Sequence, residues 1–383
     1  MSYSKVKTLF GHKQYPDYTK ESSLFLLNRN VGVELEYENV SHWPDNIKDS
    51  GEFWEITEDG SLRKIKDDSV SLELRFKYPL SGIALEKALV SLKKYLAAEK
   101  DIVCSLRTGL HVHLDVRDLS VTQIKNILIT YLIVEKILYR YCGDDRENNV
   151  FCLPIYKTPE VLQKFSLAAF QDPITFKTAV SHSWKYSGLN LLSIWKKGSI
   201  EFRQHSATTN IEEIIYWINL IYSITKYGLS LNYKVDKLIE YAATNDSILD
   251  DIFGNYIKGL DLSNLRADLD VGIESVLCLQ NNFMSSVYSN YISNNKEKKI
   301  KKKFNPGEWR EIPSSTEDHV EYMNAIQGET TRRILENNTF TINSGFTYAN
   351  VASTAGETNP WRGITASGIT PEFPDDPEEN EEP

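Results

Sequence analysis

The stretch GLHVHLDVRD, residues 109–118, combines two histidines with the alternating pattern of a β-strand. Because successive side chains of a strand point to opposite faces, His111, His113, Asp115 and Arg117 share one face. The apolar residues between them share the other face, which we expect to be buried. Imidazole nitrogens bind divalent metals and transfer protons near neutral pH, so the polar face of this strand is predicted to do chemistry.

Three further segments alternate in the same way, over residues 31–37, 71–78 and 199–205. Each places Val, Leu, Ile, Phe or Tyr on one face. The opposite faces carry Glu34, Glu36, Glu73, Arg75, Lys77, Glu201, Arg203 and His205. Four strands of this kind predict one sheet, with an apolar face under helices and a polar face rich in carboxylates, imidazoles and guanidinium groups.

The polar face is predicted to hold divalent metal ions. Glu34 and Glu36 are neighbours on it with no base between them, and like charges that close repel unless a cation separates them. Carboxylates suit a hard ion such as Mg²⁺, which also binds substrate phosphates, and arginine binds phosphoryl oxygens through parallel hydrogen bonds. The sequence has neither a GxxxxGK loop nor a GxGxxG fingerprint, so a nucleotide would bind on the open sheet face.

Two other interpretations of this face remain open. A row of surface salt bridges would place the same residues in water without any ligand. A zinc site would use the His-x-His pair, but His205 is the only further histidine placed to complete it. Magnesium with phosphate is favoured because the candidate ligands are mostly carboxylates.

Three helices are predicted to cover the apolar face. One begins near Ser81 and repeats leucine and alanine at helical spacing. The other two begin at capping boxes, formed by Ser120 with Gln123 and by Thr209 with Glu212. The segment YSGLNLLSIW, followed by the turn KKGS, predicts a hairpin partner for the last strand. The fold class is therefore α+β, with an antiparallel sheet.

The chain is predicted to divide into five parts. A polar lead-in, residues 1–28, precedes a catalytic domain of alternating strands and helices over residues 29–230. A mainly helical C-terminal extension covers residues 231–300, and an irregular region covers residues 301–370. The acidic, proline-rich segment 371–383 is predicted to be a disordered tail.

The composition excludes several classes of partner. Seven acidic residues lie in the final segment, so the rest of the chain has a net charge of −3 out of −10, which does not favour nucleic acid. No apolar run approaches the length of a membrane span, and the N-terminus shows no signal peptide. The four cysteines have no CxxC spacing, and we expect free thiols in a reducing cytoplasm.

The order of these motifs resembles that of the amidoligase family. The successive segments are VGVELEY, DGSL followed by SLELRFKYPL, TGLHVHLDV, and YSGLNLLSIWKKGSIEFRQHSATTN, and together they cover residues 29–225. This family belongs to the carboxylate–amine ligase superfamily, which includes glutamine synthetase and glutamate–cysteine ligase. The GLHVH segment also resembles the GMHxH segment of glutamine synthetase, and IEFR resembles its final ExR strand.

The resemblance implies a curved antiparallel sheet that holds two or three Mg²⁺ or Mn²⁺ ions between ATP and a carboxylate. The implied metal ligands are Glu34, Glu36, Glu73, His111 and Glu201. The predicted nucleotide-binding residues are His113, Arg203, Arg75, Lys185 and Asn190, and Lys185 departs from the family because some relatives carry arginine near this position. Arg203, which faces the transferred phosphate, and Glu34 are the implied catalytic residues. Asp59 and Ser61 match family positions to which no role is assigned, and Tyr186 matches one that shapes the site or fixes the hairpin.

The implied reaction joins a carboxylate donor to an amine acceptor, for example a peptide or a cell-wall fragment. ATP converts the carboxylate into an acyl phosphate, and the amine then displaces phosphate and leaves an amide. Two alternatives use the same residues: a metal-dependent amide hydrolase, and an inactive nucleotide-binding or peptide-binding module. Residues 235–383 carry no motif that matches a family.

Overall fold

The structure is a computed structural model, and it describes most of the chain up to residue 279. The described residues are 5–13, 15, 20–40, 52–66, 69–99, 101–158, 170, 172–183, 185–231 and 235–279. They all belong to one compact unit, residues 1–298. The predicted irregular region 301–370 and acidic tail 371–383 lie outside the described residues, and the five domain boundaries stay predictions.

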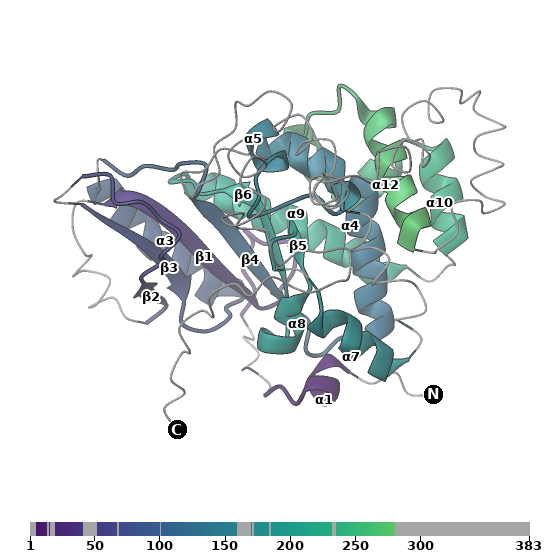
Figure 1. The fold of residues 1–383 in the computed structure, drawn as a ribbon, viewed down its shortest axis with the longest axis horizontal. Helices are drawn as coiled ribbons and strands as arrows, with labels where there is room; N and C mark the ends of the chain where they lie inside the picture. The colour runs from purple at the N-terminus through teal and green to yellow at the C-terminus, as the bar shows by residue number, and fades with distance from the viewer. Residues whose placement is uncertain are drawn as a thin grey trace, which may run out of the picture. The chain divides into compact units, whose positions relative to one another are not determined.

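One antiparallel sheet of six strands organises the fold (Figure 1). Its strands are β1 (Val31–Val40), β2 (Trp54–Thr57), β3 (Val70–Phe76), β4 (Gly109–Asp115), β5 (Leu189–Asn190) and β6 (Ser199–Ser206). Their spatial order is β2-β3-β1-β4-β6-β5, and every neighbouring pair is antiparallel. The four predicted strands are therefore β3, β1, β4 and β6, adjacent to one another, and the α+β class is confirmed.

Helices make up most of the remaining described chain. Those of the first 230 residues are α1 (Val6–Phe10), α3 (Gly82–Ala98), α4 (Val121–Cys142), α5 (Asp144–Glu147), α7 (Pro173–Ser181), α8 (Leu192–Lys197) and α9 (Ile211–Ser230), with the 3₁₀ turn η1 (Ile155–Lys157). The predicted helical extension contains α10 (Val235–Thr244), α11 (Ile248–Phe253), η3 (Gly254–Gly259) and α12 (Leu265–Leu279). No described helix combines the length and apolar character needed to cross a membrane.

The predicted apolar face of the sheet is the core of the fold. Its residues on the central strands are fully buried, including Val33 of β1 and Val112 of β4. The ring of Phe202 on β6 packs edge-on against Tyr131 of α4, with 5.8 Å between ring centroids. Figure 1 shows α3, α4 and α9 beside the sheet that they cover. The alternation therefore predicted correctly which face of β1 and β4 is apolar and packs under the helices.

One of the two predicted capping boxes is confirmed and the other is wrong. The side chains of Ser120 and Gln123 each accept from the other's backbone N–H at the start of α4. Helix α9, in contrast, is capped by Asn210, whose side chain accepts from the backbone N–H of Glu212 at 3.0 Å. Asparagine is at least as good an N-cap as threonine, so the cap moves one residue along from Thr209.

The predicted hairpin before β6 is also wrong in part. Only Leu189 and Asn190 form strand β5, and the residues expected to continue it form the short helix α8. The Asn190 side chain accepts from the backbone N–H of Leu192 at 2.9 Å, which turns the chain out of the sheet. Gly198, with a φ of 70°, ends α8 in the left-handed conformation and returns the chain to β6.

His205 does not lie on the polar face. The register between β4 and β6 shifts between Leu110 and Val112. Such a shift is typical of a β-bulge, in which one strand carries an extra residue. The side chain of His205 consequently lies on the helical side, with its ring centroid 5.2 Å from that of Trp217 on α9. Within the part of the chain that the structure describes, His205 therefore does not join His111 and His113 in a zinc site.

The far end of the β4 polar face has a structural use. Arg117 Nε donates to Asp115 Oδ1 at 2.8 Å, and both side chains are buried. Arg117 also donates to the backbone carbonyl of Lys13 at 3.1 Å and stacks on the ring of Tyr15. These two residues of the polar row therefore hold part of the N-terminal segment against the sheet.

Candidate active site

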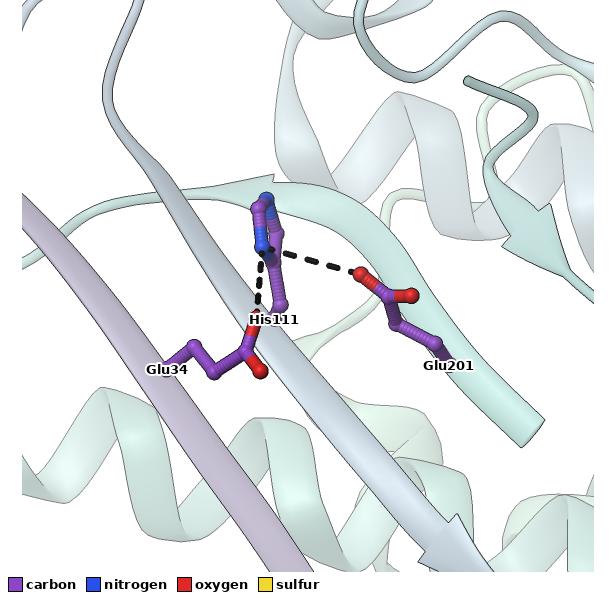
Figure 2. Close-up of side chains that lie close together, drawn as sticks. All are labelled: Glu34, His111 and Glu201. Atoms are coloured by element: carbon purple, nitrogen blue, oxygen red, sulfur yellow. Dashed lines mark ion pairs between the residues drawn. The ribbon is translucent and has the colours of Figure 1, made fainter. Parts of the chain in front are cut away.

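Three side chains converge from three neighbouring strands on the polar face of the sheet (Figure 2). Glu34 of β1 lies opposite His111 of β4 in register, and Glu201 comes from β6. Nδ1 of His111 lies 3.5 Å from Oε2 of Glu34 and 3.7 Å from Oε1 of Glu201. One ligand atom from each residue lies within 4.8 Å of the other two. We call Glu34, His111 and Glu201 the first cluster.

The first cluster fits a divalent ion. An octahedral Mg²⁺ with ligands at about 2.1 Å separates adjacent ligand atoms by about 3.0 Å and opposite ones by about 4.2 Å. His111 is 3 % exposed, and its Nδ1 has no hydrogen-bond partner among the described residues. Burial and the nearby Arg203 lower the pKa of His111 to about 4, so the ring is neutral at pH 7. A buried imidazole nitrogen without a hydrogen-bond partner in the described part of the chain therefore lies beside two carboxylates, and an ion bound by all three groups would give it a partner.

A second cluster lies on the β1–β3 side of the same face. It consists of Glu36 on β1, Glu73 on β3 and Asp59 in the loop between β2 and β3, with one oxygen of each within 4.8 Å of the others. All its candidate ligands are carboxylates, which is the set that Mg²⁺ prefers. Because Glu34 and Glu36 are two residues apart on one strand, the two clusters are neighbours.

Two carboxyl groups of the second cluster, those of Glu36 and Glu73, have pKa values raised toward or above neutral pH. Burial together with the nearby acids Asp59 and Glu73 raises the pKa of Glu36 to about 8, against the opposing effect of Arg203. Burial and Glu34 raise the pKa of Glu73 to about 7. Acids crowded in this way ionise readily only when a cation joins them, so their arrangement favours a metal ion.

Asp59 is a candidate ligand that the strand pattern did not identify. Its Oδ1 accepts from the backbone N–H of Ser61 at 2.7 Å, a local turn that fixes the carboxylate beside Glu36 and Glu73. The DGSL segment therefore has a structural role: Asp59 supplies the oxygen and Ser61 closes the turn. Loop residues have no strand alternation, so only the motif itself signalled them.

The carboxylates of the first cluster are ionised. Burial alone would raise the pKa of Glu34, but His113 and Lys197 hold it well below its usual range. Burial opposes ionisation of Glu201 as well, yet Arg203 holds its pKa below the usual range. The first cluster therefore presents two negative charges and a neutral imidazole.

Neighbouring polar groups orient these ligands. Arg203 donates from Nη1 to Oε1 of Glu201 and from Nε to the carbonyl of Phe151 at 3.2 Å. Oε2 of Glu201 accepts from Asn190 Nδ2 at 2.6 Å and from Ser193 Oγ at 2.9 Å. Asn190, predicted to bind nucleotide, thus contacts a candidate metal ligand directly. The structure fixes Glu201 from three sides and leaves little freedom in its rotamer.

The other predicted nucleotide residues lie at different distances from the clusters. His113 is in the site, with Nε2 3.1 Å from Glu34 Oε1 and Nδ1 3.0 Å from Ser199 Oγ. Arg75 faces the same side but donates to Glu55 of β2 at 2.7 Å. Lys185 lies beside Tyr186, with Nζ 5.8 Å from the ring centroid. Arg203, the third predicted cation, donates to Glu201 of the first cluster.

Lys197 is a second residue that sequence reasoning missed. It is the last residue of α8, and its Nζ donates to Oε1 of Glu34 at 2.9 Å. Although partial burial opposes it, Glu34 and Glu201 raise the pKa of Lys197 above its ordinary value. Lys197 lies in the KKGS segment, which was predicted to be a hairpin turn, so the sequence did not assign it to the site.

The polar face is not a solvated surface. Glu36, Glu201, Arg203 and His113 are each less than 8 % exposed. Burying so many ionisable groups costs free energy that exposed salt bridges do not incur, so a structural ribbon is a poor explanation of this face. Buried clusters with perturbed pKa values are typical of functional sites.

The comparison with protein families agrees with the motifs. A family model described as "Putative amidoligase enzyme" matches residues 45–225. The match begins after β1, but β1 pairs with β3 and β4, which both lie inside it, so Glu34 and Glu36 belong to the same sheet. No curated protein sequence matches the chain. Residues 45–225 of this chain are thus similar to the amidoligase family, in agreement with the order of the motifs.

Proposed function

We propose that the protein is an ATP- and Mg²⁺-dependent carboxylate–amine ligase that acts through an acyl phosphate. The family match points to an amide-bond-forming ligase. The observation that supports the finer proposal is the pair of adjacent ligand clusters on one buried face, with Arg203 beside them. Two clusters suit two Mg²⁺ or Mn²⁺ ions, and the family resemblance allows a third.

The chemistry explains why such a site needs clustered acids and arginine. A carboxylate is a poor acyl donor because its leaving group would be oxide. Transfer of the γ-phosphoryl group from ATP to a carboxylate oxygen forms an acyl phosphate and ADP, and the amine then displaces phosphate. The first step brings two anions together, so its catalysis is mainly charge neutralisation. Bound divalent ions would supply that neutralisation at both clusters.

The protein side chains have distinct parts in this proposal. Glu34, His111 and Glu201 would hold one ion, and the second cluster would hold another. Arg203 would meet the developing charge on the transferred phosphoryl group, because its guanidinium lies beside the first cluster. His113, whose ring is oriented by Ser199, would donate to a nucleotide phosphate from the nitrogen that now faces Glu34.

The substrates follow in class from the reaction. The donor is a carboxylic acid and the acceptor an amine, which we propose to be borne by a peptide or a cell-wall fragment. We further propose that the enzyme acts in the cytoplasm, where ATP is available and where the four cysteines, free in the structure, would stay reduced.

Hydroxylamine tests this proposal without knowledge of the acceptor, because it is a small nucleophile that traps acyl phosphates. The protein is incubated with ATP, Mg²⁺, hydroxylamine and a panel of carboxylic acids, and hydroxamate, ADP and phosphate are measured. We expect hydroxamate and ADP in equal amounts with the true donor. Glu34→Gln should lose this activity by at least about 100-fold, since a metal ligand is removed. Glu240→Gln, an exposed glutamate of α10, is the matched control and should keep it.

Each alternative gives a different result in the same assay. A metal-dependent hydrolase would cleave a preformed amide without consuming ATP. An inactive module would bind Mg²⁺–nucleotide and form no product. Amide cleavage without ATP by the wild type, with no hydroxamate from any acid, would contradict the ligase.

A further inference from the structure

Glu34 shares its two carboxylate oxygens between different partners. Oε2 faces Nδ1 of His111 inside the first cluster, at 3.5 Å. Oε1 accepts from Lys197 Nζ at 2.9 Å, with His113 Nε2 3.1 Å away. One oxygen of the Glu34 carboxylate thus faces His111 of the first cluster, and the other oxygen binds Lys197.

The ammonium group of Lys197 lies at the exposed margin of the site. The Lys197 side chain is 53 % exposed, whereas that of Glu34 is 13 % exposed and that of His111 is 4 % exposed. Lys197 ends a helix and has a four-carbon stem, so its ammonium can move while the backbone stays fixed. The Glu201–Arg203 pair differs, because both of these side chains are buried and Arg203 is held by the carbonyl of Phe151 as well.

Lys197 and a divalent ion would compete for the charge of Glu34. Without an ion, Lys197 is the cation that neutralises this carboxylate. With an ion on Oε2, the same carboxylate would be shared by two cations whose charges repel each other. The cation that is exposed and flexible is the one free to leave. A nucleotide phosphate bound to the ion would offer it a new anionic partner.

We propose that Lys197 is a transferable cation of the active site: it neutralises Glu34 when no metal is bound and moves to a nucleotide phosphate when metal and nucleotide bind. This inference rests on the proposed function, since it requires a metal–nucleotide complex. It gives the site a phosphate-binding cation in addition to Arg203. It also makes a prediction of opposite sign for two ligands, which a merely structural ion pair does not.

Binding of Mn²⁺ alone is the first measurement, made by electron paramagnetic resonance of free Mn²⁺. Lys197→Met should bind Mn²⁺ about two- to fivefold more tightly than wild type, because a competing cation is gone. Lys197→Arg keeps the charge and should bind Mn²⁺ as wild type does. Lys196→Met removes the neighbouring exposed lysine of α8 and should change nothing. Unchanged or weaker binding of Mn²⁺ by a folded Lys197→Met protein would overturn the proposal.

Binding of the β,γ-methylene analogue of ATP at saturating Mn²⁺ is the second measurement. Lys197→Met should weaken it by about tenfold or more, because a charge-assisted hydrogen bond to phosphate is lost. Lys197→Arg should restore most of the affinity. Tighter Mn²⁺ binding with unchanged analogue binding would overturn the transfer of Lys197 to phosphate. If the wild type binds Mn²⁺ but no analogue, the proposed function fails instead, while the competition at Glu34 is still tested by Mn²⁺ alone.

Discussion

Gly109→Ala tests directly whether His111 is a metal ligand. Gly109 begins β4, and its backbone N–H donates to Glu36 Oε2 at 2.6 Å. A Cβ atom at this position would lie 2.6 Å from Nε2 of His111, and 3.3 Å from Oε2 of Glu36. Ordinary van der Waals contacts begin near 3.4 Å, so the imidazole ring must withdraw by about 0.8 Å.

A shift of this size should disrupt metal binding by His111 but cost the fold little stability. Metal–ligand distances are held within about 0.2 Å, so a ring moved by about 0.8 Å no longer completes the first cluster. We expect the affinity of that cluster for Mn²⁺ to fall by about 10- to 100-fold, the range seen when the support of a ligand is lost. The added methyl should cost about 1–3 kcal/mol of stability, because the ring can rotate away from it.

Mn²⁺ titration followed by electron paramagnetic resonance measures the effect, and thermal unfolding checks that the protein is folded. Gly32→Ala is the matched control: its Cβ would meet His113 Cβ at 3.3 Å, a contact relieved by a shift of about 0.1 Å. We expect this control to bind Mn²⁺ within about twofold of wild type. A folded Gly109→Ala protein with wild-type Mn²⁺ affinity would refute the assignment of His111 as a ligand.

Three more changes have expected outcomes. Phe202→Ala should lower the free energy of unfolding by about 3–5 kcal/mol through a core cavity, measured in urea; a loss below about 1 kcal/mol would mean that this ring is not in the core. Arg203→Ala should also destabilise the metal-free protein, because Glu201 is left buried without its cation, and Mg²⁺ should restore part of the melting temperature. Glu36 and Glu73 bind protons more tightly in the folded chain, so the stability they contribute is complete below their unfolded pKa of 4.5 and is lost as pH rises through about 7 and 8. The melting temperature without metal should therefore fall between about pH 6 and pH 9, and saturating Mg²⁺ should reduce this fall. The Glu36→Gln variant should show a smaller fall and weaker Mg²⁺ binding. A melting temperature that rises over this pH range would contradict the raised pKa values of Glu36 and Glu73.

The strand pattern predicted most of the site because alternation links burial to chemistry. Once the apolar side chains of β1, β4 and β6 must pack under the helices, the alternating side chains are fixed to the other face, so Glu34, His111 and Glu201 share that face. Their distances could not be predicted, because the order β3-β1-β4-β6 depends on long-range pairing. Arg203 shows the limit: the face was predicted correctly, but its buried partner Glu201 makes it a structural residue as well.

The errors lie where local geometry departs from regular alternation. His205 turns to the helical side after a register shift that no residue type announces. Lys197 reached the site on a six-residue helix, a length at which strand, turn and helix patterns are hard to separate. Asp59 acts from a loop, where side-chain direction is set by one hydrogen bond to Ser61 and by no periodicity. Sequence periodicity therefore gives the sheet face, and the remaining site residues require the three-dimensional structure.

Transfer of ¹⁸O from the carboxylate to phosphate is the most direct test of the central claim. The donor found with hydroxylamine is labelled in both carboxylate oxygens, and phosphate is analysed by ³¹P nuclear magnetic resonance after turnover with an amine and Mg²⁺–ATP. In an acyl phosphate, one carboxylate oxygen becomes bonded to phosphorus and leaves with it when the amine attacks carbon. We therefore expect one ¹⁸O in each phosphate, one in each amide, and ADP as the nucleotide product. Phosphate without label, or AMP and pyrophosphate as products, would contradict the account.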